Sequence, residues 1–263
     1  GLREADLTPA AQNFLAEARH TRLVSRLEWE PALEVLGEMG AAHREVTPID
    51  VHSKIRLAAL LAEDRLHAGQ AVQAAHDWAA LICELSAADT DWANPRMSSL
   101  QLGLRAWLQL ARARVLSDQP VEGALEEAQA LMKTLRSRYL REPGAQLILV
   151  EAEQDLGLCL WFGPEEGRAR ALDHWNQAAM DLQAILDRGS AWPRLRLLLA
   201  EIHGLRAQAL KEYESRHPAN QALASAQDQL ALLPPSAQEH PEVLAARKKW
   251  DRLHYAWKGE MPK

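Results

Sequence analysis

Two short segments carry the residue types most suggestive of catalysis. His76–Trp78 and Asp173–Trp175 each join a histidine, an aspartate and a tryptophan. A histidine oriented by a carboxylate is a common general base. Consecutive helical residues, however, point about 100° apart and do not face each other. We therefore predict that each tryptophan packs inward with its polar neighbours beside it, and that neither segment is catalytic.

The histidines and cysteines lack the spacing of metal ligands. None of the ten histidines is three or four residues from another, and Cys83 and Cys159 are 76 residues apart, so no helix presents a ligand pair to one ion. Both cysteines lie in apolar helical segments, which predicts two small buried hydrophobes. The sequence contains no phosphate-binding glycine loop and no GxSxG elbow. We expect no metal, no cofactor and no enzymatic activity.

The charge balance limits the classes of partner. Thirty basic and 36 acidic residues give a net charge of −6, which argues against nucleic acid because phosphate binding requires a basic face. No apolar run approaches the roughly 18 residues of a membrane span. The chain begins at Gly1 rather than Met, so we expect it to be a piece of a longer protein. A cytoplasmic location is favoured, and a periplasmic one is left open if a membrane segment precedes Gly1.

Regularly spaced prolines divide the chain into units of similar length. Their intervals are 47, 48, 50 and 48 residues, for Pro48, Pro95, Pro143, Pro193 and Pro241. A second break lies inside each interval, at Gly69, Asp118–Pro120, Gly163–Pro164 and His217–Pro218. Apolar residues recur at steps of three and four between these breaks, which is typical of amphipathic helices. The predicted helices are 48–67, 70–87, 96–116, 120–140, 144–162, 165–188, 194–215, 219–233 and 239–257.

A fixed period of this length is typical of a solenoid, in which neighbouring helix pairs share a core. Ala62, Gly69, Ala74 and Trp78 resemble the small–glycine–small–aromatic pattern of tetratricopeptide (TPR) repeats, although the period here is near 48 residues rather than 34. The resemblance implies an all-α, TPR-like right-handed superhelix of about five helical hairpins plus a C-terminal capping helix. We expect one domain over 1–263, with an N-terminal hairpin (1–45), four helix pairs (48–233) and the cap (239–257).

In TPR proteins the first helix of each pair lines a concave groove. The resemblance therefore implies a partner-binding face on the first helices here, and the tryptophans near the turns are candidate exposed anchors. The predicted groove residues are Lys54, Arg56, Arg105, Arg112, Glu151, Arg194 and Arg206. The candidate exposed aromatics are Trp92 and Trp192. An ordinary solvated surface is the alternative interpretation of the groove residues.

The sequence favours a non-catalytic module that binds a protein or peptide, for interaction or sensing. Segments such as 163–186 and 194–210 also resemble the C-terminal repeat regions of bacterial multidomain signalling proteins, namely eukaryotic-type serine/threonine kinases and winged-helix regulators. That resemblance implies an alternative function, a regulatory or small-ligand-binding domain of a larger enzyme or transcription regulator. A self-associating scaffold, in the simplest case a homodimer, is a third hypothesis. The partner is not identified.

Overall fold

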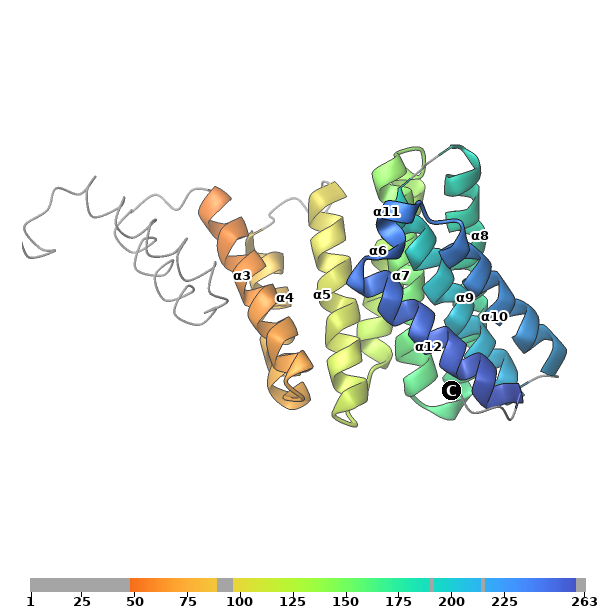
Figure 1. Ribbon diagram of the computed structural model, residues 1–263. Helices are drawn as coiled ribbons and strands as arrows, with labels where there is room; N and C mark the ends of the chain where they lie inside the picture. The colour runs from red at the N-terminus through yellow and green to blue at the C-terminus, as the bar shows by residue number, and fades with distance from the viewer. Residues whose placement is uncertain (1–47, 89–96, 190–191, 214–215, 259–263) are drawn as a thin grey trace, which may run out of the picture. The chain divides into compact units, whose positions relative to one another are not determined.

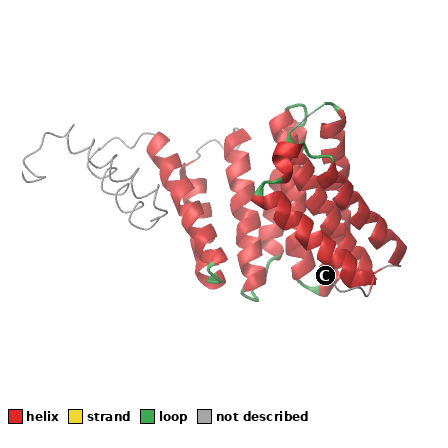
Figure 2. Ribbon diagram, viewed as in Figure 1, coloured by secondary structure: helices red, strands yellow, loops and turns green. Residues whose placement is uncertain are grey.

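The computed structural model describes residues 48–88, 97–189, 192–213 and 216–258, and all regular structure within them is helical (Figures 1 and 2). Within these described ranges ten α-helices follow one another, with a short 3-10 helix, η2 (Glu165–Gly167), before α8. Their bounds are α3 Pro48–His67, α4 Ala71–Ala88, α5 Met97–Leu116, α6 Glu122–Tyr139, α7 Pro143–Phe162, α8 Arg168–Asp187, α9 Pro193–Tyr213, α10 Arg216–Ala231, α11 Pro235–Gln238 and α12 Pro241–Lys258.

The helices predicted from the breaks in the sequence are confirmed from residue 48 onward. Four of them begin at the regularly spaced prolines, at Pro48, Pro143, Pro193 and Pro241. Proline suits the first helical turn because that turn needs no backbone N–H donor. The four-residue α11 was not predicted. The expected N-terminal hairpin, residues 1–45, lies outside the described residues.

The chain divides into two compact units, Gly1–Ala128 and Gln129–Lys263. The first unit contains α3, α4, α5 and the beginning of α6, and the second contains the rest of α6 and α7 to α12. Within each unit the contacts are mostly sequential: α4 packs against α3 and α5, and α8 packs against α7 and α9. In these pairs, helices adjacent in sequence are also adjacent in space. The two units are described separately below.

In the first unit, α3 and α5 each end in a left-handed cap. Gly69 has a φ of 78°, and the N–H groups of Gly69 and Gln70 donate to the carbonyls of Leu66 and Arg65. This is a Schellman motif, which satisfies carbonyls that the helix end leaves unpaired. Asp118, with a φ of 57°, ends α5 in the same way. At Gly69 the chain reverses in this way, and α4 returns alongside α3.

The α3–α4 hairpin closes around small residues and one tryptophan. Ala62, Ala74 and Trp78 are fully buried where α3 and α4 pack together. Asp77 accepts a hydrogen bond from Arg65 at 2.5 Å, and this ion pair ties the two helices on their partly buried side. His76 is exposed and lies 4.0 Å from Asp77. The carboxylate of Asp77 thus holds the hairpin together rather than orienting the histidine.

In the second unit α7 and α8 approach most closely where a glycine meets a tryptophan. Trp175 of α8 is buried against Gly157 of α7, and a Cβ at position 157 would lie 2.7 Å from Cδ1 of Trp175. The Trp175 indole N–H donates to the carbonyl of Gln154 at 3.1 Å. The ring of Trp161 lies against that of Trp175 at a centroid distance of 5.8 Å, with the two planes tilted by 48°. The predicted inward packing of Trp175 is confirmed.

The same arrangement recurs at the end of the chain. Trp250 of α12 is fully buried against Gly204 of α9, where a Cβ would lie 2.5 Å from Cε2 of the ring. Trp250 belongs to a core that α9, α10 and α12 share, and Leu253 and Trp257 pack against its edge. The helix predicted over 239–257 is thus present as α12, and its role as the cap of a solenoid stays a prediction.

One prediction about the cysteines was wrong. Cys159 is buried on α7, as expected, but Cys83 is exposed on α4. The apolar stretch that contains Cys83 is broader than the buried arc of α4: Leu81, Ile82 and Leu85 are buried, and Cys83 lies on the other side of the helix. A helix with apolar residues beyond its packing arc exposes the surplus.

The Gly157–Trp175 contact predicts a large effect of one methyl group. We expect Gly157→Ala to lower the free energy of unfolding by about 1–3 kcal/mol, because the added methyl group overpacks the contact and forces the Trp175 ring and α8 away from α7. Gly123→Ala is the control, since a Cβ there meets nothing within 4 Å and alanine favours the helix. Urea unfolding followed by circular dichroism would measure both. Equal midpoints for Gly157→Ala and the wild type would contradict the prediction.

Candidate functional site

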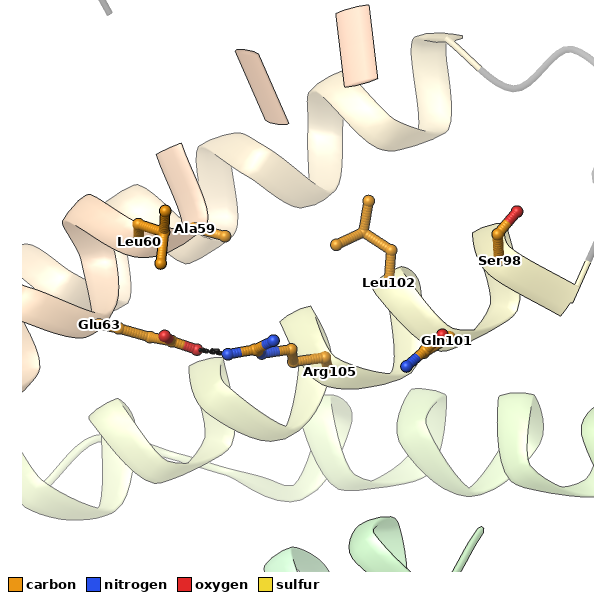
Figure 3. Close-up of a pocket in the computed structure, with 7 residues that line it drawn as sticks. All are labelled: Ala59, Leu60, Glu63, Ser98, Gln101, Leu102 and Arg105. Carbon is orange, nitrogen blue, oxygen red and sulfur yellow. Dashed lines mark hydrogen bonds and ion pairs between the residues drawn. The ribbon is translucent and has the colours of Figure 1, made fainter. Parts of the chain in front are cut away.

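In the first unit, α3 and α5 are each the first helix of a predicted helix pair. Together they enclose an open groove of about 360 Å³ (Figure 3). Because α4 packs against both helices, it holds them side by side, and they touch each other only narrowly. Seven residues line the groove: Ala59, Leu60, Glu63, Ser98, Gln101, Leu102 and Arg105. We call it the α3–α5 groove.

One part of the α3–α5 groove is apolar. Leu60 of α3 leaves 38% of its surface exposed, and Ala59 beside it is buried. Leu102 of α5 is half-buried and projects toward α3 in Figure 3. An exposed leucine in a concavity with apolar neighbours can cover an aliphatic or aromatic side chain of a partner, which removes both from water.

An ion pair links the two helices of the α3–α5 groove. Arg105 of α5 donates to Glu63 of α3 through Nε at 3.0 Å and through its second guanidinium nitrogen. The Arg105 side chain remains 56% exposed. Its planar guanidinium has five N–H donors, so it can hold Glu63 and still donate to a carboxylate or a backbone carbonyl of a bound segment. Gln101 and Ser98 add exposed polar groups along the same helix.

The predicted groove residues are distributed over several helices. Arg105 lines the α3–α5 groove, and Arg112 is exposed two turns further along α5. In the second unit Arg194 and Trp192 are exposed, whereas Glu151 and Arg206 are half-buried. The side chains of Lys54 and Arg56, and all of Trp92, lie outside the described residues. Of the predicted residues in the first unit, the structure thus places Arg105 directly in a concave site.

Arg206 belongs to a hydrogen-bonded network. Its Nε donates to Oδ1 of Asn176 on α8 at 2.7 Å, and its Nη1 donates to Nδ1 of His203 at 2.8 Å. Burial and the charge of Arg206 lower the pKa of His203 to about 4, so the imidazole is neutral near pH 7 and can accept this bond. Arg206 therefore joins α9 to α8 and is half-buried between them.

The sequence reasoning missed a triad of side chains centred on one buried carboxylate. Glu153 of α7 is only 3% exposed and accepts hydrogen bonds from Arg136 of α6 and from Nδ1 of His174 of α8, the latter at 2.5 Å. Burial alone would raise the pKa of Glu153, but the bonds and charges of His174 and Arg136 outweigh it and hold the pKa below its usual value. The signal was a lone carboxylate on the buried face of α7, between Leu149 and Leu156.

The second unit also contains a smaller cavity of about 220 Å³. It combines two guanidinium groups, a carboxylate, an amide and three apolar side chains: Arg136, Arg188, Asp181, Gln146, Leu140, Leu149 and Ala184. Nη1 of Arg188 donates to Oε1 of Gln146 at 3.0 Å, and this bond fixes one edge of the cavity. A small ligand with both charged and apolar groups would match this lining.

No group of three or more His, Cys, Asp or Glu side chains in the described part of the chain is arranged to hold a metal ion. None of the helices between residues 48 and 258 that the structure describes is long and apolar enough to cross a membrane.

Comparison with known proteins does not assign the chain to a family. No protein-family model matches the sequence, and no curated protein matches it either. The fold and the two concave sites are therefore the basis for assigning a function.

The triad predicts a pH-dependent contribution to stability. Because the pKa of Glu153 is lower in the folded protein than in the unfolded chain, the ionised carboxylate stabilises the fold above the unfolded pKa near 4.5, and this stabilisation is lost as the pH falls through the folded pKa. We expect Glu153→Gln to cost about 1–3 kcal/mol at pH 7 and progressively less between pH 4.5 and pH 3.

Urea unfolding of both proteins at several pH values would measure this difference. Glu126→Gln, on an exposed carboxylate, is the control and should change little at any pH. A difference between the wild type and Glu153→Gln that stays constant down to pH 3 would rule out the linkage to Glu153.

Proposed function

We propose that this chain is a non-catalytic, TPR-like interaction module, and that it binds a peptide or protein segment in the α3–α5 groove. The observation that carries the proposal is the exposure of Leu60 in a concavity between two first helices, next to the ion-paired but open Arg105. A single exposed leucine is ordinary on a protein surface. One that lies in a groove beside a half-free guanidinium has the features of an anchor site.

The proposed binding mode follows from the lining. Leu60, Ala59 and Leu102 would receive an apolar side chain, and burial of that side chain would supply most of the affinity. Arg105 would donate to a carboxylate or carbonyl of the bound partner segment, close to that apolar side chain. This hydrogen bond would set the direction and register of the partner segment in the groove. Helices and extended peptides both bind to helical grooves in this way.

The resemblance to TPR proteins supports the choice of this face. Three features agree with a TPR-like solenoid. They are sequential helix contacts, small residues buried between the two helices of the α3–α4 hairpin, and a buried tryptophan two turns into α4 and into α8. Under this proposal the helix pairs continue as a right-handed superhelix whose first helices share one binding face. The partner would then extend beyond the α3–α5 groove along the exposed side of α5, where Arg112 lies.

The test is partner binding by a variant that removes the apolar anchor. Partners would be captured with the wild-type chain, identified by mass spectrometry, and their affinity measured by calorimetry. We expect Leu60→Glu to weaken binding at least about tenfold, because it places a charge where an apolar side chain is buried. Leu116→Glu makes the same change at an exposed position of α5 outside the groove and should bind normally.

A charge-swapped pair separates folding from binding. The double variant Glu63→Arg/Arg105→Glu keeps an ion pair between α3 and α5 but reverses the group that faces the partner. We expect wild-type helical content with weakened binding. A partner that binds Leu60→Glu and the charge-swapped variant as tightly as the wild type would show that the α3–α5 groove is not the binding site.

A second candidate function is regulation by a small ligand, and the 220 Å³ cavity of the second unit favours it. If this candidate is right, a small amino acid or dicarboxylate in a thermal-shift screen should raise the melting temperature of the wild type. The shift should be lost in Arg188→Ala, which removes a lining guanidinium, and kept in Arg170→Ala, an exposed position of α8 outside the cavity. A screen in which no compound shifts the wild type would eliminate this candidate.

A further inference from the structure

Two opposite charges face the 220 Å³ cavity of the second unit without pairing to each other. Arg188 follows the end of α8, Asp181 lies on α8 itself, and both line the cavity. Neither has an ion-pair partner among the described residues. They are seven residues apart, which places them on one side of the helix and about 10 Å apart along its axis. Each is therefore available to the opposite charge of a ligand.

A neutral amide holds Arg188 in place without cancelling its charge. Nη1 of Arg188 donates to Oε1 of Gln146 on α7 at 3.0 Å, and the amide nitrogen of Gln146 donates to the carbonyl of Leu140 at 2.7 Å. A guanidinium has five N–H donors, so the others remain available to a ligand. Because the side chain is already ordered by Gln146, a carboxylate that binds Arg188 loses little affinity to ordering of the side chain.

The Asp181 carboxylate is also held by an amide. Gln177, one turn earlier on α8, donates to Oδ1 of Asp181 at 2.8 Å. The other oxygen, Oδ2, has no donor in the described part of the chain, and the side chain is half-buried. A ligand ammonium has three N–H donors and can bind this oxygen. Arg188 and Asp181 together therefore match a zwitterion, which is the charge state of an amino acid.

Arg136 of α6 adds a second guanidinium toward the other end of the cavity. It donates to Glu153, which lies seven residues beyond Gln146 on α7, so the two guanidinium groups are anchored about 10 Å apart along that helix. The Arg136 side chain is 41% exposed, and it has no second acceptor among the residues that the structure describes. Its remaining N–H groups can donate to both oxygens of a second carboxylate.

We propose that this cavity binds a free amino dicarboxylate, that is, an amino acid with an acidic side chain. One carboxylate would accept hydrogen bonds from Arg188 and the other from Arg136, and the ammonium would donate to Asp181. The carbon chain between the carboxylates would pack against Leu149 and Ala184 of the lining. This inference rests on the second candidate function proposed above, and it names the class of ligand.

The size and the charges of the cavity separate this class from related compounds. A volume of about 220 Å³ is below the roughly 300–1,000 Å³ of pockets for drug-sized ligands, so a ligand of few carbon atoms fits. A dicarboxylate without an ammonium would leave the Asp181 carboxylate near a like charge. An amino acid with an amide side chain would turn N–H donors toward those of Arg136 or offer a single oxygen.

The first measurement compares ligands on the wild-type chain. Isothermal titration calorimetry with glutamate, aspartate, glutarate and glutamine removes one charged group at a time. We expect glutamate or aspartate to bind at least about tenfold more tightly than glutarate and glutamine, because each of these two lacks a charge that the cavity can pair. The affinity should fall as salt is added.

The second measurement assigns the ammonium to Asp181. We expect Asp181→Asn to weaken the binding of glutamate at least about tenfold and not to weaken that of glutarate, because glutarate has no ammonium. Arg188→Gln should weaken both ligands. Asp173→Asn and Arg170→Gln make the same changes at exposed positions of α8 outside the cavity and should bind glutamate as the wild type does.

Circular dichroism of each variant would establish that it is folded. If Asp181→Asn does not fold, the comparison of ligands on the wild type decides. Three results would overturn the inference: no binding of either amino dicarboxylate, equal affinities for glutamate, glutarate and glutamine, and equal effects of Asp181→Asn and Asp173→Asn.

The failure of this inference can be told apart from the failure of the second candidate function. A different small molecule that raises the melting temperature of the wild type but not of Arg188→Ala would keep that function and overturn the choice of an amino dicarboxylate. A screen in which no compound binds would eliminate both.

Discussion

The close approach of a tryptophan ring to a glycine of a neighbouring helix is the constraint on which the second unit depends. At Gly157 and Gly204 the absence of a side chain lets the rings of Trp175 and Trp250 lie directly against the backbone of α7 and α9. Each contact sets the distance between two helices and also their rotation, because a ring of that size fits in one place. The outward orientation of the polar faces of α8 and α12 follows from these two contacts.

Polar contacts then specify what the apolar packing leaves open. Arg65 and Asp77 tie α3 to α4, Glu63 and Arg105 tie α3 to α5, and Glu153 connects three helices through Arg136 and His174. A buried carboxylate is costly unless both of its oxygens are paired, so Glu153 selects a single register of α6, α7 and α8. Apolar side chains alone tolerate small shifts along the helix axes, and paired charges do not.

The helices could be predicted from the sequence because their ends depend on local residues. Pro143, Pro193 and Gly69 act through their own backbone geometry, which needs no tertiary partner. The candidate site was only partly predictable. Arg105 was identified as a polar residue of a first helix, but Leu60 and Leu102 resemble core residues, and their exposure depends on how far α3 and α5 separate. The Glu153 triad was missed for the same reason. The partners of Glu153 lie on other helices, with Arg136 17 residues away in the sequence and His174 21 residues away.

The sequential order of helix contacts has a kinetic consequence. Within each unit, most contacts join a helix to the next one along the chain, so few long loops must close before native interactions form. Folding of low contact order is fast, and it can begin before the whole chain is present. During synthesis α3 and α4 could pack together and form the Arg65–Asp77 ion pair before α12 has been translated. In the second unit, α9 would form before α12, and Gly204 would stay uncovered until α12 packs. Insertion of the Trp250 ring against Gly204 would therefore be the last step in the folding of that unit.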